Sequence, residues 1–224
     1  MKHSVIIPAY NAQKYLSEAV ASVLPQLNAN DEIIIVNDGS TDATSATIRA
    51  MSDLRIIYLE SQTNGGIARA RNLALSIANG DWIHFLDHDD LWPPHRMSIV
   101  RSVIKRCSVD LGLVSGMVEH FVCPTLDSTD AANFKLPTVQ HAALPGSVIF
   151  SRELISQVGE FDTLLSSGEF VDLMSRVIVC KPIWFKESSI FLKRRIHGLN
   201  HTLLDKTGHE SYLQVIRSHL KRVS

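Results

Sequence analysis

Residues 32–42 read E-I-I-I-V-N-D-G-S-T-D, and this stretch decides the fold class. The unbroken apolar, β-branched run within 32–36 is typical of a strand that is buried on both faces. The polar residues 40–42 are favoured N-cap types, so we expect a helix over 43–51. A buried strand that leads directly into a helix is the repeating unit of a parallel sheet. The stretch therefore predicts an α/β protein.

The same alternation runs through the first hundred residues. Short apolar runs predict strands, and apolar residues at helical spacing predict helices. We expect strands over 5–8, 55–59 and 82–86, and helices over 12–24, over 66–78 and from Pro93-Pro94 onward. Short connections between such elements imply one mostly parallel, twisted sheet with helices on both faces. We expect the whole chain, 1–224, to form a single domain of this kind.

The second half of the chain is less regular. The expected elements are strand pieces over 110–122, a long loop over 124–140, a strand over 146–151, a helix after Ser167-Gly168, short strands near 183–185 and 190–192, and an amphipathic helix over 210–220. A loop of that length is often functional.

The composition excludes several classes of protein. The net charge is −1, which gives no general attraction to nucleic acid or to an anionic membrane. The three cysteines lie far apart, so neither a disulfide framework nor a zinc site is expected. The first apolar run is too short for a signal peptide, and no stretch reaches the ~20 apolar residues of a membrane span. We expect a cytoplasmic protein that can still associate with a membrane surface.

Polar segments follow three of the predicted strands, at residues 9–11, 37–42 and 87–90. Ligands of parallel α/β sheets bind beyond the carboxyl ends of the strands, which is where these segments lie. The sequence therefore predicts a ligand site at this edge of the sheet.

The last of these segments is the richest in acids. In F-L-D-H-D-D-L-W (85–92), alternation along an extended backbone places Asp87 and Asp89 on the same side. Two carboxylates on one side form a natural clamp for a divalent cation such as Mg²⁺ or Mn²⁺. The alternative is that Asp89 or Asp90 only caps the helix at Pro93 or solvates a turn.

Four motifs occur in order along the first half, each at a strand end or a helix start. They are V-I-I-P-A-Y-N (5–11), E-I-I-I-V-N-D-G-S-T-D (32–42), G-G-I-A-R-A-R-N (65–72) and G-D-W-I-H-F-L-D-H-D-D (80–90). Together they resemble the family 2 glycosyltransferases, which have the GT-A fold. The resemblance is close over residues 3–100 and looser up to about His201. It implies an inverting, metal-assisted transfer of a sugar from a nucleoside-diphosphate donor, with UDP as the expected nucleotide.

The resemblance also divides the chain by role. It implies that residues 1–100 bind the nucleotide-sugar and that residues 101–224, with the C-terminal helix, bind the acceptor. The implied substrate-binding residues are Pro8, Ala9, Tyr10, Asp38, Arg71, Asp87 and His88. Asp38, in the pair Asn37-Asp38, would accept a hydrogen bond from the imide of a uracil-like base. The implied cofactor is Mn²⁺ or Mg²⁺, held by Asp87, Asp89 and His197.

Two of these assignments have an alternative in the residues themselves. Arg71, like Arg69, could instead lie on a solvated helix face. His197, in R-R-I-H-G-L-N-H-T (194–202), resembles a late family motif whose histidine can approach the metal or the diphosphate. A single histidine in a loop is otherwise an ordinary surface residue.

The acceptor-activating base is the main departure from the family pattern. Relatives usually carry G-E-D and use the last acid as the base, whereas this chain has Gly168-Glu169-Phe170. A helix over 169–179 would have an apolar stripe of Phe170, Leu173, Met174, Val177 and Ile178. Glu169, Asp172 and Arg176 would share another face, so Glu169 is the expected base and Asp172 the reserve. The alternative is that both acids only complement the helix N-terminus.

Two other functions are compatible with the sequence. The missing acid at position 170 fits a module that binds a nucleotide-sugar without transferring it. A nucleotidyltransferase has a similar sheet, but it normally needs a glycine-rich, basic loop where this chain has P-A-Y-N-A-Q (8–13). The expected partners are the donor and an unidentified acceptor, either a glycan, a lipid-linked glycan, a peptide or a small metabolite. Nucleic acid is not an expected partner.

Overall fold

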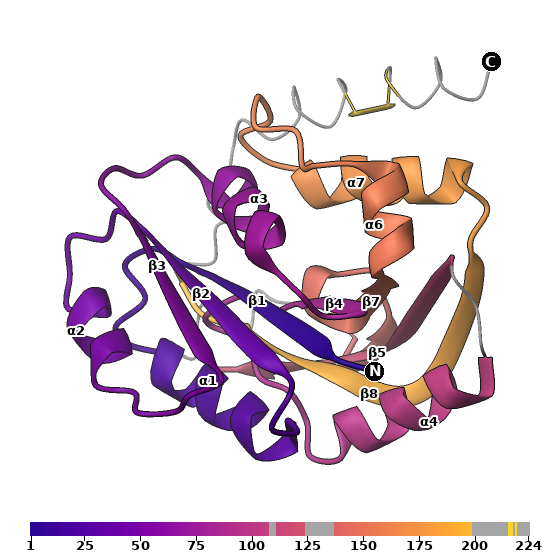
Figure 1. The fold of residues 1–224 in the computed structure, drawn as a ribbon, viewed down its shortest axis with the longest axis horizontal. Coiled ribbons are helices and arrows are strands. Elements are labelled where there is room, and N and C mark those ends of the chain that lie inside the picture. Colours follow the sequence, from indigo (N-terminus) through magenta and orange to yellow (C-terminus); the bar gives the residue numbers. More distant parts are fainter. Residues whose placement is uncertain (108–110, 124–136, 199–214, 217, 219–224) are drawn as a thin grey trace.

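The computed structural model describes residues 1–107, 111–123, 137–198, 215–216 and 218, which form an eight-stranded sheet with helices on both faces (Figure 1). The strands are β1 (His3–Ala9), β2 (Glu32–Asp38), β3 (Ile56–Ser61), β4 (Trp82–Phe85), β5 (Gly112–Val122), β6 (Val139–His141), β7 (Val148–Ser151) and β8 (Ile183–Ile196). The helices are α1 (Leu16–Val23), α2 (Thr44–Arg49), α3 (Ile67–Ile77), α4 (Arg96–Cys107), α6 (Arg152–Val158) and α7 (Glu169–Val179), with short 3-10 helices at Leu24–Gln26 and Pro145–Ser147. The predicted α/β class is confirmed.

The first half of the chain builds the parallel part of the sheet, in the order β3-β2-β1-β4. Every residue of β1 and β2 is buried, as their continuous apolar runs predict. Side chains alternate between the two faces. Val5 and Ile7 therefore join a core cluster with α1 and α4, and Ile6 joins a second cluster with α3, α6 and α7. The sheet separates these two cores, and its carboxyl edge carries the loops that follow the parallel strands.

The second half makes the sheet mixed. β7 runs antiparallel to β4 and β5, β6 runs antiparallel to β5, and β8 runs parallel to β5. The two short strands predicted near 183–185 and 190–192 are parts of β8, because the polar residues between them form an irregularity in the pairing rather than a turn. Helix α6 was not predicted. It is short, follows β7 without a loop, and is capped by Ser151, whose Oγ accepts the Leu154 N–H.

The first predicted helix begins later than expected. Its start was predicted at Ala12, but α1 starts at Leu16. The backbone N–H groups of Ala12 and Gln13 donate to the side chains of Thr44 and Asp42, at 2.7 and 3.2 Å. These contacts hold the segment as a loop that faces the loop after β2.

Two predicted segments lie largely outside the described residues. They are the long loop over 124–140, whose last two residues begin β6, and the helix over 210–220, of which residues 215, 216 and 218 are described and helical. Of the helices in the described part of the chain, none is long and apolar enough to cross a bilayer.

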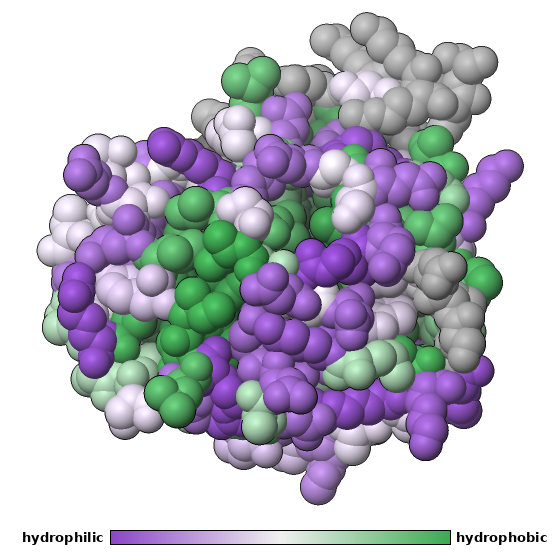
Figure 2. Space-filling model, in the orientation of Figure 1, coloured by the Kyte–Doolittle hydropathy of each residue, from purple (hydrophilic) through white to green (hydrophobic). Residues whose placement is uncertain are grey.

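Strand β3 forms the edge of the parallel part of the sheet. Its residues Ile57 and Leu59 are only partly buried, and they pack against the core cluster that includes α3. Figure 2 shows apolar surface gathered on the side of the molecule where β2, β3 and α3 lie. The apolar run at 55–59 therefore forms an edge strand with one open flank.

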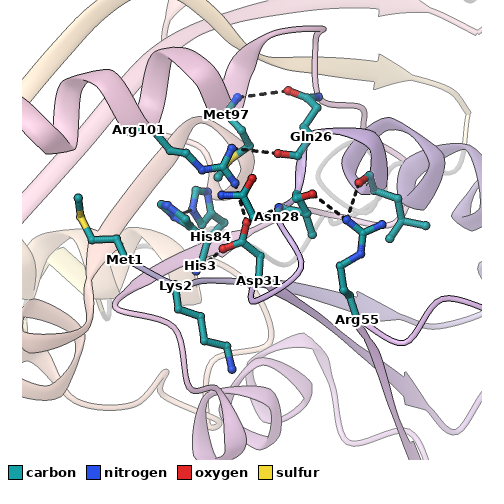
Figure 3. A network of polar contacts seen from close by, with 12 residues as sticks. Met1, Lys2, His3, Gln26, Asn28, Asp31, Arg55, His84, Met97 and Arg101 are labelled. Carbon is teal, nitrogen blue, oxygen red and sulfur yellow. Dashed lines mark hydrogen bonds and ion pairs between the residues drawn. The ribbon is translucent and has the colours of Figure 1, made fainter.

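A buried polar network joins β1, β4 and α4 near the amino ends of the strands (Figure 3). His84 Nε2 lies 3.0 Å from His3 Nδ1, and His84 Nδ1 lies 3.1 Å from the Arg96 guanidinium. A guanidinium can only donate, so His84 Nδ1 accepts and its Nε2 carries the proton that His3 accepts. Asp31 accepts the His3 backbone N–H and pairs with Arg101. Burial lowers the pKa of His3 to about 4 and the pKa of His84 well below its usual value, so both rings are neutral.

Candidate active site at the carboxyl edge of the sheet

The loop after β1 is fastened to the loop after β2, and together they form one wall of the site. Asn11 has a left-handed backbone conformation, with φ 49°, and its Oδ1 accepts the Thr41 backbone N–H at 2.9 Å. Pro8 and Ala9 are buried at the end of β1, whereas Tyr10 is 42% exposed. Tyr10 is therefore the member of this predicted segment whose side chain can meet a ligand directly.

Asp38 ends β2 and holds the start of α3 in place. Its buried carboxylate accepts the backbone N–H groups of Gly65, at 3.0 Å, and Gly66, at 2.7 Å. The next residue, Gly39, has φ +69°, and a Cβ there would lie 2.5 Å from the carbonyl carbon of Thr63. Only glycine fits this close approach. Asp38 lies at the predicted edge of the sheet. Its recognition of a base stays a prediction.

Asn37, the residue before Asp38, is bound by side chains of the neighbouring strand β3. Its amide nitrogen lies 3.2 Å from Tyr58 Oη and 3.3 Å from Glu60 Oε1. A carboxylate at position 37 would repel Glu60, and an amide donates to it instead. A shallow cavity of about 350 Å³ opens beside Asn37 and is lined by Asn37, Gly39, Ser40, Glu60, Ser61 and Gln62.

Arg71 of α3 is almost completely buried, with 1% of its surface exposed. Its Nη2 donates to Asp87 Oδ1 at 2.8 Å, and its Nη1 donates to Glu169 Oε1 at 2.5 Å. The guanidinium also lies 5.3 Å from the centre of the Phe161 ring. The alternative of a solvated helix face is therefore wrong for Arg71, whereas Arg69 is exposed.

The acidic segment after β4 is a turn. The Asp90 backbone N–H donates to the Asp87 carbonyl, so the backbone does not continue as an extended strand. Asp87 consequently faces Arg71, and Asp89 Oδ2 lies 2.9 Å from His197 Nε2. The extended backbone on which the shared side of Asp87 and Asp89 was predicted is therefore absent, because this turn replaces it. Within the described part of the chain, no three His, Cys, Asp or Glu side chains converge closely enough to hold a metal ion, so the structure unites two of the three predicted ligands.

The pair of Asp89 and His197 is shielded from solvent. The side chains are 16% and 10% exposed, and the His197 ring lies 5.0 Å from the Tyr15 ring. Burial opposes the ionisation of Asp89, but the hydrogen bond with His197 and the charges of His88 and His197 outweigh it and lower the pKa of Asp89. His197 is therefore not a surface residue, and its role at the metal or the diphosphate stays a prediction. His88, the remaining predicted substrate-binding residue, is partly exposed between the acids.

Asp90 anchors the end of β8, whereas the sequence alternative had Asp89 or Asp90 cap the helix at Pro93 or solvate a turn. Its Oδ1 accepts the Arg195 backbone N–H at 2.8 Å. The Arg195 side chain donates to the Asp89 carbonyl at 2.9 Å and pairs with Glu18 of α1 at 2.6 Å. Burial, followed by the charges of the neighbouring carboxylates, raises the pKa of Asp90 well above its usual value. The sequence analysis missed this role of Arg195, and the R-R pair before the histidine motif was its only signal.

Helix α7 begins at Glu169, and its two predicted faces are largely confirmed. Phe170 is buried, with its ring 6.2 Å from that of Phe150. Ile178, at the far end of the predicted stripe, is 53% exposed and is the one member that does not join the core. Position 170 therefore belongs to the hydrophobic core and contributes no acid to the site.

The two acids of α7 have different partners. Glu169 pairs with Arg71, as described above. Asp172 Oδ2 lies 2.9 Å from Arg176 Nε, and Arg176 also donates to the carbonyls of Val158 and Glu160. These contacts fasten α7 to the end of α6, which favours a structural role for Asp172.

Solved structures show which fold the chain has. Residues 1–349 of S. aureus TarS, in complex with UDP-GlcNAc, match 100% of this chain with a TM-score of 0.82 at 20% identity. The mannosyltransferase PcManGT from Pyrobaculum calidifontis, in complex with GDP-Man and Mn²⁺, matches 99% with a TM-score of 0.68 at 19% identity. The chain spans 66% and 63% of these two chains. The fold is the GT-A fold of glycosyltransferases.

The sequence places the protein within that class. The family model described as Glycosyl transferase family 2 matches residues 4–118, about half of the chain. An uncharacterized glycosyltransferase of Rickettsia typhi is 29% identical over an alignment of 232 residues. The alignment covers 99% of this chain and 72% of the relative. The chain belongs to glycosyltransferase family 2.

Proposed function

We propose that this chain transfers a sugar from a UDP-linked donor to an acceptor hydroxyl, with inversion at the anomeric carbon and with the help of Mn²⁺ or Mg²⁺. The observation that carries the proposal is the contact of 2.9 Å between Asp89 and His197, just beyond the carboxyl end of β4. Structures of the same fold that were solved with UDP-GlcNAc, and with GDP-Man and Mn²⁺, support a nucleotide-sugar as the ligand and a divalent cation as its companion.

The donor nucleotide is proposed to lie along the wall formed by the loops after β1 and β2. Tyr10 is exposed there and would face the base, and Pro8 and Ala9 would contribute backbone groups. Asp38 already binds two backbone N–H groups. A carboxylate offers about four acceptor positions, so one more donor, such as a base imide, can still bind. His88 and Asp87 would face the ribose and the diphosphate.

The chemistry of Asp89 and His197 fits a divalent cation. Such cations usually bind one or two protein ligands and complete their coordination with substrate phosphates and water. Asp89 supplies a carboxylate oxygen, and His197 supplies Nε2, which a neutral imidazole can turn to a metal. Asp87 has its Oδ1 on Arg71, so its other oxygen is the one that would join them. A bound cation would stabilise the charge that develops on the departing diphosphate.

Glu169 is the residue we propose as the general base. Arg71 holds its Oε1, so Oε2 is the oxygen that would take the proton of the acceptor hydroxyl. Glu169 lies in the first turn of α7. Its partner Arg71 also binds Asp87, which belongs to the donor side of the site. Asp172 remains the second candidate, although its contact with Arg176 favours anchoring of the helix.

One observation favours a second candidate function. The family's usual acid is replaced by Phe170, whose ring is part of the core. A chain that keeps the donor wall but lacks an effective base would bind a nucleotide-sugar without transferring it. The nucleotidyltransferase alternative has no such support.

The acceptor and the location follow from the same proposal. The acceptor would be a glycan, a lipid-linked glycan, a peptide or a small metabolite. The proposed location is the cytoplasm, with association at a membrane surface.

A donor screen tests the proposal. Purified protein is titrated with UDP, GDP and UDP-sugars, with Mn²⁺ and with chelator, and binding is measured by thermal shift and calorimetry. We expect binding of UDP and of at least one UDP-sugar that weakens in chelator. Turnover is then measured against a panel of acceptors from the four classes. Donor binding without turnover on every acceptor would favour the non-catalytic module, and the absence of donor binding would overturn both.

A further inference from the structure

Arg71 connects the donor side of the site to the acceptor side. It comes from α3, and its two terminal nitrogens bind acids from two other elements. Asp87 follows β4 and belongs to the proposed donor site, whereas Glu169 opens α7 and is the proposed base. The two acids lie 82 positions apart in the sequence. One buried guanidinium therefore joins the two functional halves.

The surroundings of Arg71 hold it in this position. Its guanidinium lies 5.9 Å from the centre of the Phe85 ring and 5.3 Å from that of Phe161, and 1% of the residue is exposed. The planar guanidinium can bind two acids at once with fixed geometry, whereas the ammonium of lysine acts as a single point charge. An arginine that is both buried and shared between two acids is suited to fix their relative position.

We propose that Arg71 is a positioning residue that couples the binding of the donor at Asp87 to the placement of Glu169. This inference rests on the proposed function. Asp87 and Glu169 share one positive charge, so the strength with which Arg71 binds either acid depends on the charge of the other acid. If Glu169 loses its charge, Arg71 binds Asp87 more tightly and makes it less available to the donor. Glu169 then influences donor affinity without contacting the donor.

The test measures the affinity for UDP, with Mn²⁺ present, by calorimetry. Four proteins are compared: wild type, Glu169→Gln, Arg71→Lys and the double variant. We expect Glu169→Gln to weaken UDP binding about fivefold in the wild-type background, a size typical of coupling between sites. In the Arg71→Lys background the same change should have little effect, because lysine cannot bridge both acids. The readout is free UDP, so it requires neither the acceptor nor turnover.

Matched controls separate positioning from stability. Arg69→Lys changes an exposed arginine on the same helix and should leave the coupling intact. Thermal unfolding of every variant shows whether it is folded, and Arg71→Gln replaces Arg71→Lys as the second background if the latter does not fold.

The outcomes are distinct. An equal effect of Glu169→Gln in both backgrounds, or no effect in the wild-type background, overturns the positioning role and leaves the proposed function intact. A wild-type protein that binds no UDP overturns the proposed function and this inference together.

Discussion

Asp89 and His197 are 108 positions apart in the chain, and their side chains meet with Oδ2 and Nε2 at 2.9 Å. The contact exists because the loop after β4 and the end of β8 lie side by side, joined by a backbone bridge between Leu91 and Lys193. It is the feature of the site on which metal binding is proposed to depend.

The first prediction concerns this pair. Asp89→Asn should lower the affinity for Mn²⁺ in the presence of UDP by about tenfold or more. His197→Ala should lower this affinity as well, because each variant lacks one of the proposed ligands. The affinity is measured by calorimetric titration of Mn²⁺. Glu153→Gln, an exposed acid on α6, is the control and should bind Mn²⁺ as the wild type does. Full activity of the wild type in excess chelator would contradict the metal role.

The second prediction separates the two acids of α7. Glu169→Gln should lower transfer to a true acceptor by roughly 10²–10⁴-fold, the size of general-base catalysis, while the protein stays folded. Asp172→Asn should lower the free energy of unfolding by about 1–3 kcal/mol, because it breaks a buried, charge-assisted contact with Arg176. Transfer assays and urea denaturation measure the two effects. If both variants transfer normally, neither acid is the base.

The third prediction concerns Asp38. Asp38→Ala removes the partner of two backbone N–H groups as well as the proposed contact to the base. Asp38→Asn keeps one oxygen that can accept the backbone N–H groups of the glycines, but its amide nitrogen cannot accept a hydrogen bond. If Asp38 recognises the base, both variants should bind free UDP about tenfold more weakly, as expected for one lost hydrogen bond to a charged group. Weaker binding in the alanine variant alone would mean that Asp38 acts only by holding the loop.

The fourth prediction concerns stability in acid. Burial lowers the pKa of His3 from 6.5 to about 4, so the folded state binds its proton less readily than the unfolded state does. The stabilisation is fully present above pH 6.5 and is lost as the pH falls towards 4, and it amounts to about 3 kcal/mol. The low pKa of His84 acts in the same direction.

The measurement is urea denaturation from pH 7.5 to 4.5. His3→Asn should be less stable than the wild type at pH 7.5 and should lose less stability over this range. His141→Gln, an exposed histidine, serves as the control. Parallel pH profiles for wild type and His3→Asn would show that the buried pair does not determine the acid response.

The parallel half of the fold could be predicted because local sequence specifies it. The apolar run at 32–36 has one stable environment, between two layers of helices, and β2 is buried throughout. Phe170 was placed in the core from helical spacing alone, and the structure confirms it. In both cases the periodicity of one element determines which side of it is buried.

The details of the site could not be predicted in the same way. The extended backbone assumed at Asp87 and Asp89 is absent, because a backbone hydrogen bond closes a turn that the sequence offered only as an alternative. The sequence left two alternatives for Arg71, a ligand contact and a solvated helix face, because its partners Asp87 and Glu169 come from elements that meet α3 only in the folded protein. Side chains that are paired over long sequence distances leave no periodic signal.

The anchoring of the acidic loop by Arg195 has a consequence for how the protein is made. Asp89 and Asp90 leave the ribosome roughly a hundred residues before the arginine that binds their loop and links it to Glu18. Until β8 emerges and pairs with β5, a nascent chain has every acid of the donor side but lacks the strand that gives the loop its shape. The ability to hold a metal and a donor would then arise late in synthesis, so an interrupted translation product would be inert rather than a partial enzyme.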